Sequence, residues 1–155
     1  MYAVGSINLK TLGRLKRSDF LRDFELNALG AALAVQAALP ALKKSGDASV
    51  VLFSSIAASQ GFSMHASIGM AKAAVSGLTL SLAAELAPAI RVNAIAPGEV
   101  ETAILSPGTD KIVEKLPMQR LGQPKEVADV IWFLCSDQSS YISGAEIEVN
   151  GAQHV

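Results

Sequence analysis

The sequence has few of the residues that mark metal, disulfide or nucleic-acid-binding proteins. It contains one cysteine and two histidines, so an internal disulfide is impossible and no cluster of metal ligands is present. Lys and Arg total 13 against 14 Asp and Glu, and no cationic run exceeds two residues, which excludes an extended basic surface. No apolar run approaches the roughly 20 residues of a membrane span, and no secretory leader pattern is visible. We expect a soluble, cytoplasmic protein that binds neither nucleic acid nor a membrane.

Length and hydrophobicity predict one domain over residues 1–155. Half of the chain is hydrophobic, and a domain of this size buries roughly 70% of the surface that its unfolded chain exposes. Cys135 follows the apolar run 130–134, which includes Trp132 and Phe133. This run predicts that all three side chains lie in the core.

Helical and strand-like segments alternate along the chain. Ser18 and the carboxylates of Asp19 and Asp23 are typical of a helix start, and the alanine-rich pattern predicts a helix over 19–44 that bends at Pro40. The continuous apolar run 49–53 is typical of a strand buried on both faces of a parallel sheet. A second helix is predicted over 66–86, where Gly69, Ala73, Gly77 and Ser81 form a stripe of small side chains suited to helix packing.

The second half of the chain repeats this alternation. A strand is predicted over 91–95, a helix that opens at Pro124, and a last strand over 145–149 that alternates apolar with charged residues and suits a sheet edge. Residues 106–118 read as a disordered loop of the kind that can form a lid. The order of elements predicts an α/β fold with a parallel sheet and flanking helices.

The spacing of a few polar residues carries the functional prediction. Asn27, Ser55 and Lys72 stand at the spacings of the asparagine, serine and lysine of the short-chain dehydrogenase/reductase family, and the stretch 91–102 resembles that family's strand-to-loop signature. The C-terminal segments 120–128, 141–144 and 149–151 are also similar to the family, and residues 2–5 resemble its Asn-Asn-Ala-Gly turn loosely. The resemblance implies a doubly wound, Rossmann-like sheet of which this chain is the later part, without the N-terminal dinucleotide-binding βαβ units.

The resemblance also implies a chemistry for these residues. It implies an oxidoreductase that uses NAD or NADP on an alcohol or carbonyl substrate. Ser55 would polarise the substrate oxygen, Asn27 would support a water chain, and Lys72 would hold the cofactor ribose. Pro97 and Gly98 would turn the chain under the nicotinamide, while Val100 and Thr102 would contact its carboxamide or pyrophosphate.

One position departs from the family pattern. Ile68 stands where the family has its tyrosine, whose hydroxyl passes the proton to or from the substrate oxygen. His65 lies two helical turns before Lys72, and Ser67 points about 100° away from the vacant position, so neither is placed to replace the tyrosine. General acid catalysis contributes a factor of about 10² to 10⁴, and its loss leaves slow turnover at most.

Three hypotheses follow from this pattern. The chain is an oxidoreductase by lineage, with impaired or absent activity; or it is a non-catalytic scaffold that assembles through its helices at 19–44 and 66–86 and its C-terminal strand; or it is a fragment of a longer chain. No glycine-rich turn followed by a helix occurs in the sequence. All three hypotheses are compatible with a homo-oligomer, which is the expected assembly.

Overall fold

The fold is built on one parallel sheet. The computed structural model describes residues 2–103 and 110–155. Its strands are β1 (Ala48–Phe53), β2 (Ile90–Pro97) and β3 (Glu146–Val149), hydrogen-bonded in that order and all parallel. The predicted α/β class and the place of the last strand at an edge of this sheet are confirmed.

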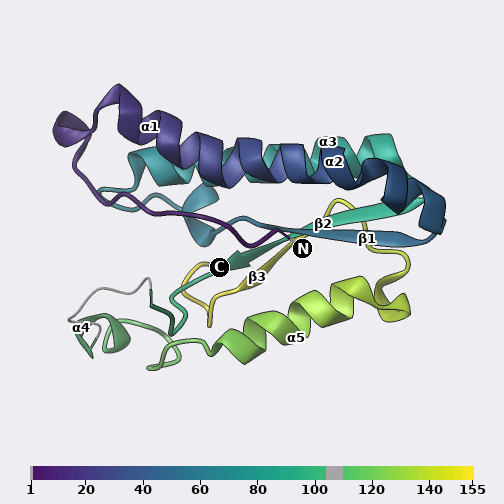
Figure 1. Cartoon of the computed structure of the whole chain (residues 1–155). Coiled ribbons are helices and arrows are strands. Elements are labelled where there is room, and N and C mark those ends of the chain that lie inside the picture. Colours follow the sequence, from purple (N-terminus) through teal and green to yellow (C-terminus); the bar gives the residue numbers. More distant parts are fainter. Residues whose placement is uncertain (1, 104–109) are drawn as a thin grey trace.

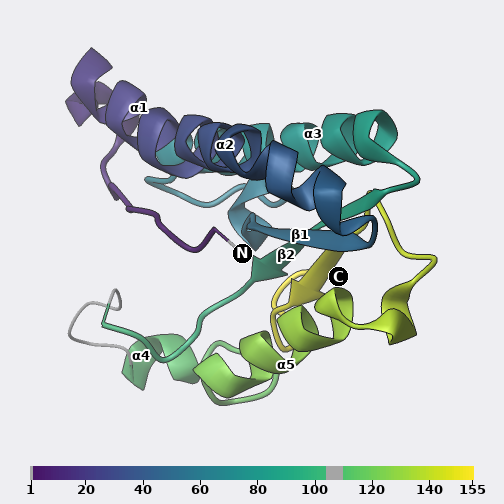
Figure 2. The ribbon, with the colours of Figure 1, turned by 45° about the vertical axis from the view of Figure 1, so that its right-hand side comes forward.

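Helices cover both faces of the sheet. The helices α1 (Arg17–Phe24), α2 (Gly30–Ser45) and α3 (Ala66–Leu86) lie on one face, and α5 (Pro124–Cys135) lies on the other (Figures 1 and 2). A short helix, α4 (Asp110–Val113), lies near the end at which the strands finish. The predicted lid falls partly on residues 104–109, which lie outside the described residues.

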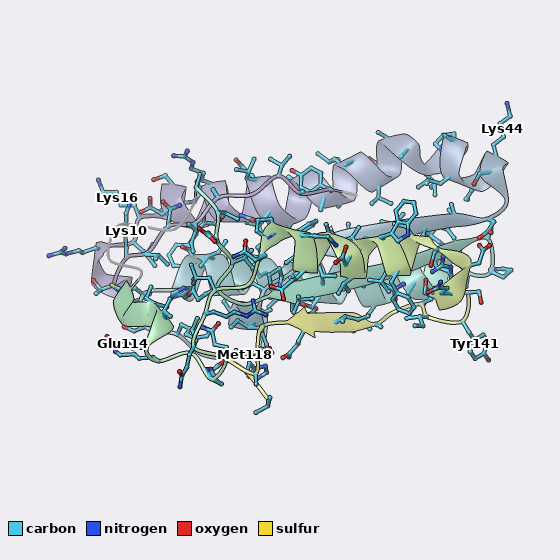
Figure 3. The ribbon with its side chains drawn as sticks, turned by 90° about the horizontal axis from the view of Figure 1, so that it is seen from below. Lys10, Lys16, Lys44, Glu114, Met118 and Tyr141 are labelled. Carbon is cyan, nitrogen blue, oxygen red and sulfur yellow. The ribbon has the colours of Figure 1, made fainter. Side chains whose placement is uncertain are left out.

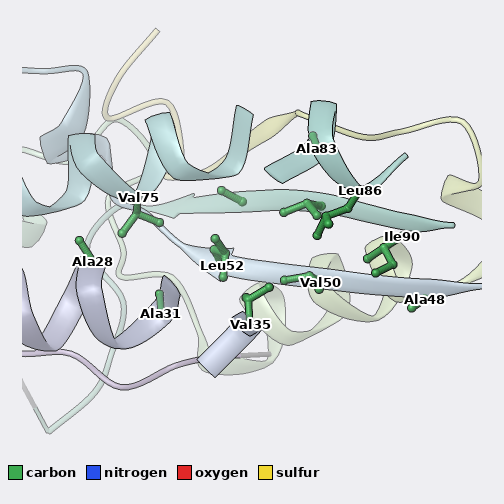
Figure 4. Packing of buried hydrophobic residues seen from close by; sticks show 12 residues of the cluster. Ala28, Ala31, Val35, Ala48, Val50, Leu52, Val75, Ala83, Leu86 and Ile90 are labelled. Carbon is green, nitrogen blue, oxygen red and sulfur yellow. The ribbon is translucent and has the colours of Figure 1, made fainter. Parts of the chain in front are cut away.

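The core follows from the two-residue period of the strands. Val50 and Leu52 of β1 point into the layer of α2 and α3, where they pack with Val75 and Leu86 (Figure 4). Val51 points to the opposite face and packs in the cluster that includes Leu134 of α5. Because successive side chains of a strand point to opposite faces, one continuous apolar run fills two separate layers.

The apolar run of α5 does not lie wholly in the core, and two predictions for it were wrong. Trp132 is 78% exposed and Cys135 is exposed. Val127, Ile131 and Leu134 face the sheet at helical spacing, so residues 132 and 135 fall on the outer side. Phe133 packs at the margin of this cluster and is half-buried.

Residues 17–45 form one helical rod with an interruption. The π-turn Glu25–Leu29 separates α1 from α2, and the Gly30 N–H bonds to the Glu25 carbonyl. The helix begins at Arg17, so Ser18 is not its cap; instead Asp19 accepts the Lys16 N–H at 2.9 Å. The rod passes through Pro40 and ends at Gly46, whose φ of 77° suits glycine.

Two helices meet the length and apolarity of a membrane span, Arg17–Ser45 and Ala66–Leu86. Both pack against the sheet, and helices that cover the core of an α/β fold have the same composition.

The two ends of the sheet carry different labelled side chains. Lys10, Lys16 and Glu114 lie at the end where the strands finish, and Lys44 and Tyr141 lie at the opposite end (Figure 3).

Candidate functional site

The predicted site residues gather at the carboxyl ends of β1 and β2. Ser55 follows β1 by two residues, and Pro97 and Gly98 lie at the point where β2 ends. Lys72 comes from α3 and Asn27 from the π-turn, both in the helical layer above the sheet. Ligand sites of parallel α/β sheets lie at this edge.

Lys72 is fixed against the end of β1. Its Nζ donates a hydrogen bond of 2.8 Å to the carbonyl of Phe53, the last residue of the strand. Burial lowers the pKa of the Lys72 ammonium to about 8. Among the described residues Lys72 forms no ion pair. The amine is thus held against the carbonyl of Phe53, which precedes Ser55 by two residues. No carboxylate of the described residues neutralises it.

Asn27 occupies the π-turn and leaves one oxygen unpaired. Its Nδ2 donates to the Asp23 carbonyl at 2.9 Å and to the Ser6 carbonyl at 3.4 Å. Its Oδ1 is one of three buried side-chain acceptors without a partner among the described residues, the others belonging to Gln60 and Glu146. π-Turns are frequent at functional sites. Asn27 therefore supports the helix interruption with its amide nitrogen, while its buried oxygen has no partner among the described residues.

Gly5 lies directly beside this acceptor and Lys72. A Cβ added to Gly5 would lie 2.7 Å from Asn27 Oδ1 and 3.9 Å from Lys72 Nζ. A side chain at position 5 would therefore collide with Asn27, which explains the glycine. The backbone of Gly5 thus packs directly against Asn27 and close to Lys72.

Ser55 keeps a free hydroxyl proton. Its Oγ accepts the Ala57 N–H at 3.1 Å, and no acceptor for its proton is recorded among the described residues. Ser54, by contrast, is buried and engaged with Ser76 at 3.0 Å. Ser55 is the serine of this pair that can donate to a ligand oxygen.

The position of the expected proton donor is filled by hydrocarbon. Ile68 is 3% exposed, one turn before Lys72 on α3. His65 is the N-cap residue of α3, and its Nδ1 lies 2.7 Å from the Ser63 carbonyl. Ser67 is fully buried and donates its proton to Asp23 at 2.6 Å. In the described contacts neither neighbour is free to act as the donor.

The loop after β2 offers a backbone pair for a ligand. Gly122 donates to the Glu99 carbonyl at 2.9 Å and accepts from the Glu101 N–H at 2.9 Å. In this parallel bridge the N–H and C=O of Val100 point away from Gly122, and neither has a partner within residues 2–103 and 110–155. Thr102 lies two residues further on and is exposed.

The turn itself is held by two contacts. Gly98 donates to the Val149 carbonyl at 3.1 Å, and the Gln153 side chain accepts the Glu99 N–H at 3.1 Å. A Cβ on Gly98 would come within 3.0 Å of the Asn150 backbone. This close approach explains the glycine after Pro97.

A buried carboxylate beside the site was not predicted. Asp23 was read as a helix-start charge, but its side chain is fully buried and accepts hydrogen bonds from Ser67 at 2.6 Å, Asn8 at 2.9 Å and Ser6 at 3.1 Å. These bonds join the N-terminal segment, α1 and the start of α3. The only signal in the sequence is its spacing of four residues from Asn27, which places both on one helix face.

Comparisons with known proteins agree with this geometry. The family described as Enoyl-(Acyl carrier protein) reductase matches residues 2–154. "Protein FixR" of Bradyrhizobium diazoefficiens is 44% identical over 142 residues, which are 88% of this chain and 50% of that protein. "Dehydrogenase/reductase SDR family member 4" of Oryctolagus cuniculus is 40% identical over 134 residues, 82% of this chain and 52% of that protein. The chain therefore spans about half the length of these relatives.

Solved structures show the same arrangement. The structure described as "ElxO with NADP Bound" superposes with a TM-score of 0.89 at 32% identity and covers 96% of this chain and 64% of its own. A 3-oxoacyl-[acyl-carrier protein] reductase from Brucella melitensis has a TM-score of 0.90 at 30% identity and covers 99% of this chain and 61% of its own. The partial Rossmann-like sheet predicted from the sequence is confirmed by these likenesses.

The Asp23 network predicts a measurable loss on an isosteric change. Asp23→Asn replaces one carboxylate oxygen by an NH₂ donor, so at least one of the donors Ser6, Asn8 and Ser67 loses its acceptor. We expect the free energy of unfolding, measured by urea titration, to fall by about 1–3 kcal/mol. Asp129→Asn, which removes an exposed ion pair on α5, serves as the control, with a change below about 0.5 kcal/mol. Equal stability of the two variants would show that the buried network contributes nothing.

Proposed function

The chain belongs to the short-chain dehydrogenase/reductase family, and from this membership we propose that it carries the nicotinamide side of an NAD(P)-dependent oxidoreductase site that lacks its proton donor. The substrate class is an alcohol or a carbonyl compound. The observation that carries the proposal is the buried Ile68 in the family's tyrosine position, one turn before Lys72. The scaffold of the site is retained, while the group that moves the proton is a hydrocarbon.

The polar groups at the strand ends suit a nicotinamide nucleoside. Lys72 would hold the ribose hydroxyls, Pro97 and Gly98 would lie under the ring, and Val100 and Thr102 would bind the carboxamide or pyrophosphate. The N–H and C=O of Val100, which have no partner in the described part of the chain, match the acceptor and donor groups of a carboxamide. When bound, the nicotinamide supplies or accepts a hydride. The residues present fit this half of the cofactor, and they do not distinguish NAD from NADP.

The substrate would meet a partial set of catalytic groups. The Ser55 hydroxyl proton has no acceptor among the described residues and can be donated to a carbonyl oxygen, and Asn27 would support a water chain, as the family resemblance implies. Ile68 can neither donate nor accept a proton. We therefore propose that the chain binds a carbonyl compound in a polarised position and turns it over slowly or not at all.

Restoring the tyrosine tests this proposal. Ile68→Tyr is expected to raise reductase activity with NADPH or NADH on a panel of aldehydes and ketones by a factor of about 10² to 10⁴. Ile68→Phe is the matched control, because it adds the ring without the hydroxyl and is expected to give no gain. The rate is followed as the loss of nicotinamide absorbance. Equal rates for the tyrosine and phenylalanine variants would contradict the proposal that this is an oxidoreductase site that lacks its proton donor.

A second candidate function is assembly without catalysis. The stripe predicted on α3 is largely uncovered, since Ala73, Gly77 and Ser81 are exposed. Leu80 of α3 is 61% exposed and Leu33 of α2 is 53% exposed. Exposed apolar helix faces of this kind are typical of interfaces between subunits. We propose that the helical layer forms a homo-oligomer, with the C-terminal strand as a further contact, in the cytoplasm.

The oligomer proposal predicts the effect of one charge. In analytical ultracentrifugation at micromolar concentration the chain is expected to sediment as a dimer or larger. Leu80→Glu is expected to shift it to the monomer, because burying an unpaired carboxylate in an apolar interface is strongly unfavourable. Leu12→Glu, the same change at an exposed leucine before α1, is expected to leave assembly intact. A monomeric wild-type chain would exclude this assembly.

A further inference from the structure

One side chain holds the backbone of the turn that follows β2. Gly98 donates to the Val149 carbonyl and the Glu99 carbonyl accepts from Gly122, and both of these contacts join backbone to backbone. The Glu99 N–H differs, because its acceptor is the side-chain oxygen of Gln153 at 3.1 Å. Among the described hydrogen bonds, Gln153 supplies the only side chain that anchors the backbone of this turn.

Gln153 is itself held by a compact turn after β3. Its N–H donates to the Asn150 carbonyl at 3.1 Å, and Asn150 Oδ1 accepts the Ala152 N–H at 2.9 Å. Ala152 has a φ of 62°, which residues other than glycine seldom adopt. Since this conformation is unfavourable for an alanine by itself, the surrounding contacts must fix the turn.

The residue after Gln153 closes this turn onto β3. His154 Nδ1 lies 2.8 Å from Glu148 Oε1. Asn150 Nδ2 donates to the other carboxylate oxygen of Glu148 at 2.6 Å and to the His154 carbonyl at 2.9 Å. Gln153 therefore lies between two residues, Asn150 and His154, that are both bonded to the last strand. Its side chain reaches the β2 turn from a fixed base.

The two turns fit closely at Gly98. A Cβ on Gly98 would lie 2.7 Å from Gln153 Oε1 and 3.0 Å from the Cα of Asn150. Glycine at this position thus lets the Gln153 side chain reach the neighbouring N–H of Glu99. The contact depends on residues from both turns.

We propose that Gln153 is a positioning residue for the nicotinamide, because it fixes the Glu99 N–H and thereby the place of Val100 relative to the sheet. Gly122 holds the peptides on either side of Val100 but belongs to the loop before α5. Gln153 ties the same turn to the segment that β3 anchors. A binding group that is already placed loses less freedom when a ligand binds.

This inference rests on the proposed function, since it assigns to Gln153 a part in binding the same cofactor. The Val100 N–H and C=O, which have no partner in the described part of the chain, are the groups proposed to meet the carboxamide. Gln153 touches neither the ligand nor these groups. It acts through the backbone of Glu99.

Amide exchange tests, without any cofactor, whether Gln153 holds the turn. Gln153→Met keeps the length of the side chain and removes the acceptor. By NMR, the Glu99 amide is expected to exchange about 3 to 10 times faster in this variant, as the loss of one hydrogen bond allows. The Ala145 amide, whose acceptor is the Asn93 side chain, is expected to keep its rate, which excludes a global loss of stability. Gln36→Met, the same change at an exposed position of α2, is the control.

Cofactor affinity tests whether the held turn serves the nicotinamide. In a fluorescence titration with NADPH, the Kd of Gln153→Met is expected to be about 3 to 10 times that of the wild type, and the Kd of Gln36→Met to be unchanged. An unchanged exchange rate at Glu99 would overturn the proposal, as would faster exchange with an unchanged Kd. A wild-type chain that binds no NADPH would overturn the proposed function and this role with it, whereas the exchange rates would still report whether Gln153 holds the turn.

Discussion

The central strand β2 is the constraint to which the rest of the structure is fitted. Side chains on both of its faces are fully buried, including Val92, Ala94 and Ile95. A strand covered on both sides has little freedom to slip, because a shift of one residue would exchange its two faces. β1 and β3 pair with it on either side. The loops that leave the carboxyl ends of β1 and β2 therefore start from fixed points.

Most of the buried polar groups are hydrogen-bonded within the chain, and some of the exceptions lie near the site. Asn93 on β2 accepts the Ala145 N–H at 3.0 Å and donates to the Ile142 carbonyl at 2.9 Å, so it joins the last strand to the sheet. Asp23 is saturated in a similar way. Two polar groups at the same edge as Lys72 and Ser55 have no partner among the residues that the structure describes: the Oδ1 of Asn27 and the backbone N–H and C=O of Val100. Groups without a partner in the chain are those that a ligand can satisfy.

The sequence predicted the helices and strands better than it predicted which of their side chains are buried and what those side chains contact. The helix over 66–86 and the strands at β1, β2 and β3 were predicted because their apolar periods and flanking glycines and prolines act locally. The exposure of Trp132 and Cys135 was not, because an apolar run does not say which helix face a partner covers. The π-turn at Asn27 and the burial of Asp23 depend on contacts with residues distant in the chain. Ile68 was identified by spacing alone, whereas the close packing of Gly5 against Asn27 required the structure.

A fluorescence titration of NADPH tests the central claim, that the nicotinamide side of the site is retained around Lys72. The chain is predicted to bind saturably, and Lys72→Met to bind more weakly because the group that holds the ribose is gone. The same titration with NADH compares the two cofactors on equal terms. No binding at millimolar cofactor, or equal binding by Lys72→Met, would contradict the account.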